Sequence, residues 1–180
     1  MTPRPARRGD DDRDRLWRRV LWTMPSGLYV IGTAADGRRN LMTANLVVQV
    51  ATDPRQVAVA IESDSLTRRL LDDGAVFAVS LLRREDRAML RRFAKAVPES
   101  DVDVAASGAG TMGAAAVIAA VTGAPVLAQA AAYVDCRVAH AVALGSHVLY
   151  VGEVVDAGFG PGGEDVEVLR MEDTRLHYGG

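Results

Sequence analysis

Three hydroxyl side chains stand where a strand-like run gives way to a helix-like one. Ser63, Ser65 and Thr67 lie in the segment SDSLT, between the apolar run VAVAI and the leucines of SLTRRLLDDG. Free N–H groups at a helix N-terminus attract anions, and hydroxyls add hydrogen bonds to phosphate oxygens. Hydroxyls at a helix start are more often simple N-caps. The segment therefore indicates a phosphate site only if a second phosphate-binding element exists.

A basic segment could supply that element. In RAMLRRFAK, the side chains of Arg91, Arg92 and Lys95 fall on the exposed side of a predicted helix. The planar guanidinium group matches phosphate oxygens with two parallel hydrogen bonds. Taken by itself, however, the segment is better interpreted as a solvated basic face.

Other common catalytic arrangements are missing from the sequence. The chain contains no Gly-x-Ser-x-Gly motif, and its only thiol, Cys136, has apolar neighbours in a strand-like run, which indicates a structural role. His140, His147 and His177 do not have the spacing of metal ligands. We therefore expect neither covalent catalysis nor a metal centre.

A glycine-rich stretch matches the dinucleotide-binding fingerprint. Gly108, Gly110 and Gly113 have the G-x-G-x-x-G spacing, and Asp135 follows at roughly the distance of a ribose-binding carboxylate. A dinucleotide-binding fold requires further β-α-β units, and the sequence after this stretch reads as a long hairpin. A surface loop with a short helix is the favoured interpretation.

Composition excludes several classes of partner. The 180 residues include 21 basic and 23 acidic side chains, with no basic stripe interleaved with aromatics, so we do not expect nucleic acid binding. The longest apolar stretch is interrupted by Gly123 and Pro125, which argues against a membrane span. The charged start has no signal-peptide core, and the lone Cys136 cannot form an internal disulfide. We predict a cytoplasmic protein.

Hydrophobic periodicity predicts a mainly β chain. Residues 1–12 read as a disordered tail and residues 13–180 as one domain. Helices are predicted over residues 13–24, 65–74 and 84–95. Strands are predicted over residues 27–35, 38–52, 55–61, 75–82, 130–144 and 147–159, while residues 97–124 are ambiguous. Such a series favours an antiparallel barrel or sandwich.

Several blocks of sequence share their order with one known family. They are MPSGLYVIGT, LMTANLVVQVATDP, VAVAIESDSLTRRLLDDGAVFAVSLL, RRFA, GAPVLAQAAAYVDCRV and GSHVLYVGEV. From about residue 22 to residue 180 the chain resembles the flavin reductase family of FMN-binding split barrels. The resemblance implies a six-stranded antiparallel Greek-key split β-barrel with short flanking helices. It also implies a homodimer whose flavin lies in a groove near the subunit interface.

The resemblance assigns roles to individual residues. The segment that lines the edge of the flavin ring would comprise Thr43, Ala44, Asn45 and Leu46. The phosphate or ribityl chain would be held by Ser63, Asp64, Ser65, Leu66 and Thr67, with Arg92, Phe93 and Ala94 closing around the same end. His147 would lie near the nicotinamide, and the tail residues Arg175, His177 and Tyr178 would approach the flavin face.

The chain departs from the family pattern in three places, one of which is the Ala/Gly-rich stretch of residues 105–120, where many relatives have a more polar loop. Val47, Val48 and Gln49 replace the small hydroxyl residues of many relatives, which implies fewer contacts to the ring. Ser146 precedes His147 where relatives often have Asp, which puts nicotinamide use in question.

The implied activity is hydride transfer from NADH or NADPH to FMN, or to FAD, with the reduced flavin serving a partner monooxygenase. In such a reaction the cofactor supplies the chemistry and the protein orients it. Two alternatives remain open: a flavin-binding electron carrier that does not use nicotinamide, and an oxidase or tailoring enzyme acting on a small organic substrate.

Overall fold

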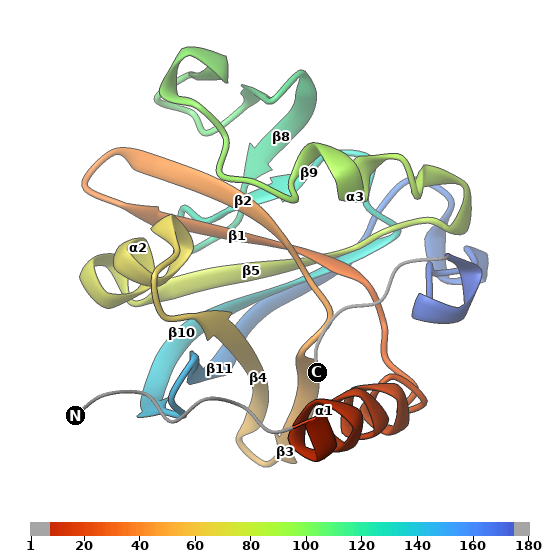
Figure 1. Cartoon of the computed structure of the whole chain (residues 1–180). Coiled ribbons are helices and arrows are strands. Elements are labelled where there is room, and N and C mark those ends of the chain that lie inside the picture. The colour runs from red at the N-terminus through yellow and green to blue at the C-terminus, as the bar shows by residue number, and fades with distance from the viewer. Residues whose placement is uncertain (1–7, 175–180) are drawn as a thin grey trace.

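The computed structural model describes residues 8–174 and is mainly β, as predicted (Figure 1). The α-helices are α1 (Arg8–Leu21), α2 (Leu66–Gly74) and α3 (Met89–Arg92). The strands are β1 (Tyr29–Ala35), β2 (Arg38–Ala44), β3 (Val47–Thr52), β4 (Arg55–Glu62), β5 (Val76–Leu81), β6 (Val102–Val104), β7 (Gly110–Met112), β8 (Ala115–Ala119), β9 (Pro125–Leu127), β10 (Ala132–Ala143) and β11 (His147–Phe159). Short 3-10 turns occur at Arg84–Asp86, Glu99–Asp101, Gly163–Asp165 and Met171–Asp173.

The main sheet is antiparallel and has seven strands in the order β2-β1-β5-β10-β11-β4-β3. Its edge strands, β2 and β3, follow each other in the chain through the Asn45-Leu46 link. The single strand predicted over residues 38–52 is therefore wrong, because the chain crosses here from one sheet edge to the other. Within residues 8–174 the strands form two sheets and no closed barrel, so the six-stranded split barrel remains a prediction.

Residues 102–127 form a second, four-stranded sheet, β6-β7-β8-β9. The loop and short helix predicted for the glycine-rich stretch are wrong in this respect, because Gly110 lies in β7 and the backbone at Gly108 and Gly113 turns through positive φ angles. These strands are only three to five residues long. Such short runs give too little alternation for periodicity to detect.

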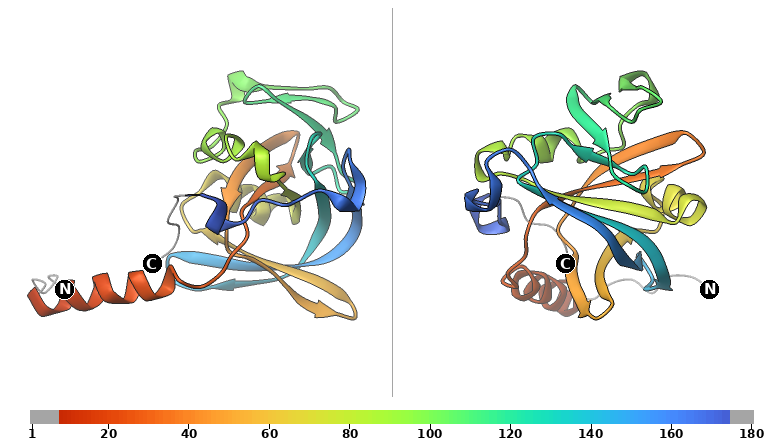
Figure 2. Two further views of the ribbon diagram at one scale, coloured as in Figure 1. Left: turned by 90° about the vertical axis from the view of Figure 1, so that its right-hand side faces the viewer. Right: turned by 180° about the vertical axis from the view of Figure 1, so that it is seen from behind.

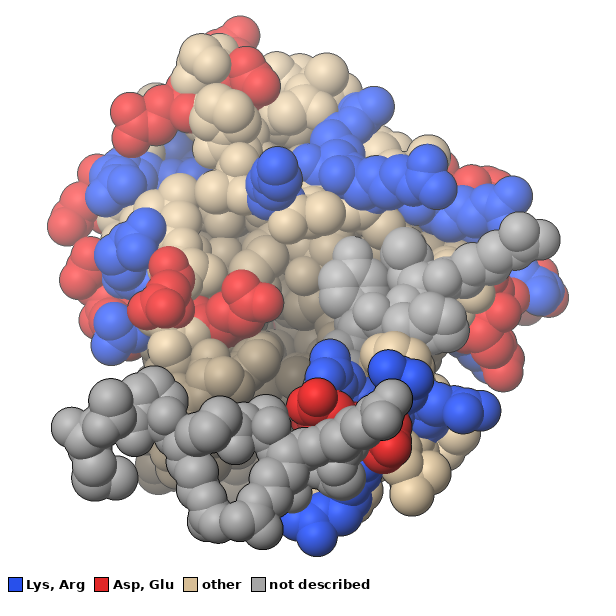
Figure 3. All heavy atoms as spheres, viewed as in Figure 1, with Lys and Arg blue, Asp and Glu red and all other residues tan. Residues whose placement is uncertain are grey.

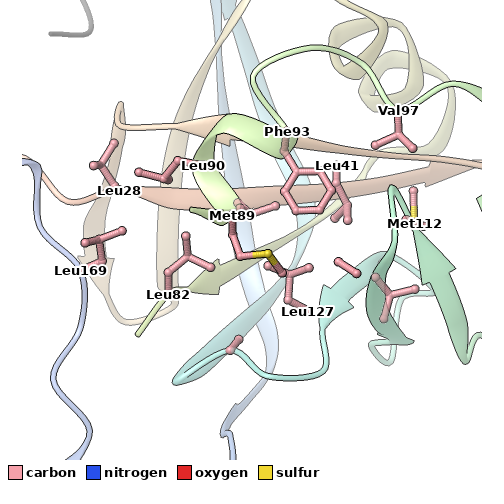
Figure 4. Packing of buried hydrophobic residues seen from close by; sticks show 14 residues of the cluster. Leu28, Leu41, Leu82, Met89, Leu90, Phe93, Val97, Met112, Leu127 and Leu169 are labelled. Carbon is pink, nitrogen blue, oxygen red and sulfur yellow. The ribbon is translucent and has the colours of Figure 1, made fainter. Parts of the chain in front are cut away.

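The largest core cluster fills the space between the main sheet, the second sheet and α3 (Figure 4). From α3 and the residue that follows it, Met89, Leu90 and Phe93 are buried in this cluster. On β1, Val30 belongs to this cluster and Ile31 to a second one, as the alternation of side chains along a strand requires. The buried side of α3 anchors the basic residues on its other side.

Helix α1 projects away from the rest of the molecule (Figure 2). It begins at Arg8, so the helix includes residues that composition alone assigned to a disordered tail. Asp11 and Asp12 near its start, with Arg18 and Arg19 in its last turn, complement the helix dipole and favour the earlier start. Among residues 8–174, no helix has the length and apolar character needed to span a membrane.

Candidate functional site

A groove of about 870 Å³ opens where the two edges of the main sheet meet. Its walls come from the segment before β1, the Asn45-Leu46 link, β3, β4 and the turn between β10 and β11. The lining includes Trp22, Tyr29, Asn45, Leu46, Val47 and His147. Its size lies within the range of cavities that enclose cofactors and drug-sized ligands.

The Asn45-Leu46 link is fixed in the groove wall by backbone hydrogen bonds. The Ala60 N–H donates to the Leu46 carbonyl oxygen at 3.0 Å, and the Val47 N–H donates to that of Asn45 at 3.0 Å. Ala44, by contrast, is buried in the core. Of the residues assigned to the flavin ring, Asn45 and Leu46 therefore line the groove.

Thr43 supports a neighbouring segment. Its hydroxyl donates to the Leu90 carbonyl oxygen at 2.8 Å, and its N–H donates to that of Phe93 at 2.9 Å. The residue is 9% exposed. Thr43 thus fixes the end of α3 to β2, and these bonds help to explain why the helix predicted over residues 84–95 ends at Arg92. The helix begins only at Met89, after the 3-10 turn Arg84–Asp86.

The three predicted hydroxyls have different surroundings. Ser65 is the N-cap of α2, as the sequence indicated: its hydroxyl accepts from the Arg68 N–H at 3.0 Å and donates to the Glu62 carbonyl oxygen. Ser63 donates to the carbonyl oxygen of Gly145, which ties α2's start to the turn before His147. Thr67 is 1% exposed. Its hydroxyl accepts a hydrogen bond from the buried Asn40 at 2.8 Å.

Replacement of the cap gives a first prediction. Ser65→Ala removes the acceptor of the Arg68 N–H, so we expect the free energy of unfolding to fall by about 1 kcal/mol. Urea denaturation followed by circular dichroism measures the change. Ser100→Ala is the control, because the exposed Ser100 hydroxyl bonds only to the neighbouring Asp101 side chain. Equal midpoints for both variants would contradict a capping role.

The residues assigned to the end of α3 differ in exposure. Phe93 is fully buried and Ala94 is exposed, while Arg92 donates to the Ala114 carbonyl oxygen at 3.1 Å. Arg91 and Lys95 are also exposed. Lys and Arg side chains gather over α3, along the upper edge of a hollow in the surface (Figure 3). Asp64, near the start of α2, is exposed as well.

His147 begins β11 and is half-buried in the groove. Its Nδ1 lies 2.9 Å from the Ser146 hydroxyl, and it is paired with Glu62 across the β4–β11 ladder. The structure therefore brings His147 to the same groove as Asn45 and Leu46. The predicted tail contacts, Arg175, His177 and Tyr178, lie outside the described residues.

Sequence reasoning missed the aromatic wall of the groove. Tyr29 lines it, and burial raises the pKa of the Tyr29 phenol. Its ring lies against Gly27, where an added Cβ would overlap the Tyr29 hydroxyl and lie 2.7 Å from Cε2. The signal was present in the block MPSGLY: a glycine two residues before a tyrosine allows the ring to fold back over the backbone.

The remaining perturbed groups lie outside the groove lining. Cys136 is buried, which raises the pKa of its thiol to about 12 and is in keeping with the predicted structural role. Burial raises the pKa of Tyr150 to about 12, with a smaller contribution from its hydrogen bond to Asp72. Burial also raises the pKa of Asp135, which accepts hydrogen bonds from the Thr122 N–H and hydroxyl. Asp135, the candidate ribose-binding carboxylate, therefore stabilises the turn at Thr122. The glycine-rich stretch is followed by strands β8 and β9 and not by the helix of a dinucleotide-binding fold.

Comparison with known proteins decides the family. The family model described as the flavin reductase like domain matches residues 21–178. The chain belongs to the flavin reductase family. A relative within this family, the NAD(P)H ferric-chelate reductase of Archaeoglobus fulgidus, is 30% identical over 161 residues, which cover 87% of this chain and 88% of the relative.

Solved structures of flavin reductases have the same fold. The NADH:FAD oxidoreductase SgcE6 of Streptomyces globisporus, in complex with NAD and FAD fragments, is 25% identical with a TM-score of 0.71, and the match covers 94% of each chain. The styrene monooxygenase flavin reductase of Pseudomonas putida is 25% identical with a TM-score of 0.65. This match covers 81% of the present chain and 88% of the Pseudomonas chain.

Proposed function

We propose that this protein is an NAD(P)H-dependent flavin reductase that binds FMN, with FAD as the alternative flavin and NADH or NADPH as the hydride donor. The observation that carries the proposal is the groove in which Asn45 and Leu46 meet His147. These residues belong to separate blocks of the sequence, and both blocks were assigned to flavin or nicotinamide contacts. The relatives that are named as NAD(P)H and NADH reductases support the same activity.

The chemistry of the groove fits a flavin. A flavin ring has apolar faces and a polar edge, and the groove offers Trp22, Tyr29 and Val47 beside the polar Asn45 and His147. The hydroxyl of Ser63 and the N-terminus of α2 lie beside the turn that precedes His147. The exposed basic residues of the segment after Leu90 supply positive charge for a phosphate. We call the α2 N-terminus with Ser63 and Ser65, together with the basic segment of residues 90–97, the phosphate cradle.

A bound flavin would supply the hydride-accepting ring, so the protein's part is binding and orientation. Asn45 and Leu46 would hold the edge of the ring, and His147 would orient the nicotinamide against its face. The aromatic wall would exclude water from the stacked rings. No side chain is required to act as a strong acid or base.

We further propose that the reduced flavin leaves the groove for a separate monooxygenase. A relative named as the flavin reductase of a styrene monooxygenase supports this role. The groove is open to the surface, so the product can leave without unfolding any element of the sheet. Cytoplasmic location follows as part of the same proposal, because reduced nicotinamides are the hydride source.

A homodimer is also proposed, in which α1 of one copy covers β3 of the other. On α1, Leu16, Trp17, Val20 and Leu21 form one apolar stripe, and more than half of each side chain is exposed. The link and β3 present a second apolar row at alternate positions, formed by Leu46, Val48 and Val50. A projecting 14-residue helix is marginal in water unless its apolar stripe is packed.

This assembly would complete the groove. Leu21 and Trp22 line it on one side, and Leu46 and Val48 line it on the other, so the proposed dimer surface and the flavin site share a wall. We infer that the curled sheet, with β2 and β3 joined at the Asn45-Leu46 link, corresponds to the six-stranded split barrel. Residues 13–180 are proposed to act as a single flavin-binding domain.

An anaerobic assay tests the function. Catalytic amounts of the protein are mixed with excess FMN and NADH or NADPH, and the loss of oxidised-flavin absorbance is followed against an enzyme-free control. We expect bleaching over many turnovers. Tight flavin retention without bleaching would overturn the reductase and favour the electron carrier, an alternative suggested by the pairing of His147 with the neutral Ser146 hydroxyl in place of a carboxylate.

A further inference from the structure

Asn40 is a buried amide that no part of the proposed chemistry uses. It lies in β2 and is 1% exposed. Its Nδ2 donates to the Thr67 hydroxyl at 2.8 Å, and its Oδ1 accepts from the Val97 N–H at 3.1 Å. Both ends of the amide are therefore occupied, as burial of such a polar group requires.

The two partners of Asn40 belong to the two halves of the phosphate cradle. Thr67 is in the first turn of α2, next to the Ser65 cap, and Val97 ends the basic segment. These elements are separated in the chain by β5 and by the 3-10 turn Arg84–Asp86. Asn40 thus connects, through one side chain, two elements that the chain order leaves apart.

The same strand also holds the other end of the basic segment. Thr43 on β2 binds the carbonyl oxygens of Leu90 and Phe93, and Asn40 binds the Val97 N–H. The backbone carrying Arg91, Arg92 and Lys95 is therefore fixed to β2 at both ends. Thr43 acts only on this half of the cradle, whereas Asn40 acts on both.

We propose that Asn40 is a positioning residue that holds the α2 N-terminus and the basic segment at the separation that a flavin phosphate requires. The inference rests on the proposed function and adds to it the determinant of phosphate recognition. A side chain with one donor and one acceptor in fixed geometry is needed, because an ionised carboxylate could not donate to Thr67. Asn40 and Thr67 are too deeply buried to contact the phosphate themselves, so their effect passes through the elements they connect.

The test compares FMN with riboflavin, which has the same ring and ribityl chain but no phosphate. Dissociation constants are measured by quenching of flavin fluorescence for the full-length protein and for Asn40→Leu, which keeps the branching at Cγ and removes both hydrogen bonds. We expect FMN affinity to fall by about tenfold and riboflavin affinity to change by less than about twofold. If Asn40→Leu does not fold, Asn40→Ser removes the same bonds without added volume and carries the same expectation.

Thr33→Val is the matched control. Thr33 pairs directly with Asn40 in the β1–β2 ladder, is fully buried, and donates to the Val76 carbonyl oxygen at 2.9 Å. The valine substitution removes this buried hydrogen bond of the main sheet and changes no contact to either half of the phosphate cradle. We expect both flavins to bind this variant as they bind the unmodified protein.

The remaining outcomes distinguish failure of the Asn40 positioning role from failure of the proposed flavin reductase function. An equal loss of FMN and riboflavin affinity in Asn40→Leu, or no loss of either, would overturn the positioning role. The same selective loss of FMN affinity in Thr33→Val would overturn it too, because general loosening of the sheet would then explain the effect. If the unmodified protein binds both flavins equally, the inference alone fails; if it binds neither, the proposed function fails as well.

Discussion

Gly32→Ala is expected to destabilise the fold strongly, because the added methyl group would meet backbone. Gly32 lies in β1, where the main sheet meets β9 of the second sheet. A Cβ at this position would overlap the Pro125 carbonyl oxygen and lie 2.9 Å from its carbon. The blocking group is backbone, so it cannot move aside as a flexible side chain would. Relief requires the two sheets to separate, which removes contacts from the largest core cluster.

Overpacking of a well-packed interior costs about 1–3 kcal/mol, and we expect Gly32→Ala to lie at or above the upper end of this range. Urea denaturation followed by circular dichroism measures the loss. Gly37→Asn is the control: position 37 has open space around it, and its φ of +77° is one that Asn tolerates. A midpoint for Gly32→Ala equal to that of the control would contradict the close packing of β1 on β9.

Trp17→Glu combined with Leu21→Glu is expected to convert the proposed homodimer into a monomer. These side chains are 56% and 52% exposed in the single chain, and they lie on the apolar stripe of α1. Burial of a fully exposed side chain of this kind contributes about 1.5–3 kcal/mol, so each of these half-exposed side chains contributes about half of that, and the twofold assembly counts each one twice. Two carboxylates would also have to lose their hydration on association. The dimer dissociation constant should therefore rise on the order of a hundredfold or more.

Light scattering coupled to size-exclusion chromatography gives the mass of each variant. Ile118→Glu is the matched control, because Ile118 is a comparably exposed apolar residue that lies on β8 rather than on α1 or β3. We expect this control to remain dimeric. The α1 variant should also bind FMN more weakly, because Leu21 lines the groove. A monomeric unmodified protein, or a dimeric α1 variant, would contradict the assembly.

Local signals in the sequence located many of the elements correctly. The Ser65 cap and the leucines after it predicted α2, because an N-cap and a helical apolar stripe act over a few residues. The alternation through β10 and β11 predicted the long hairpin, with a glycine of positive φ at Gly145 in its turn. Where local preference failed, as in residues 102–127, the strands were too short for a pattern to develop.

Site prediction from the sequence had a different limit. The family resemblance assigned Asn45, Leu46 and His147 to the flavin and nicotinamide site, and all three line one groove. Their contacts to a flavin or nicotinamide remain a prediction. The sequence could not distinguish a hydroxyl that faces a ligand from one already bonded within the protein. Thr43 and Thr67 were assigned to the flavin, yet their hydroxyls bond to Leu90 and Asn40.

The sequence by itself determined the β-rich class, helix α2 and the long β10–β11 hairpin, because each depends on residues close together in the chain. Only the tertiary structure decided which of these residues share a surface. Asn40 was not identifiable from its neighbours in the chain, because both of its hydrogen-bond partners, Thr67 and Val97, are distant in sequence. A buried amide acquires its role when folding removes water and leaves the protein to satisfy both of its ends.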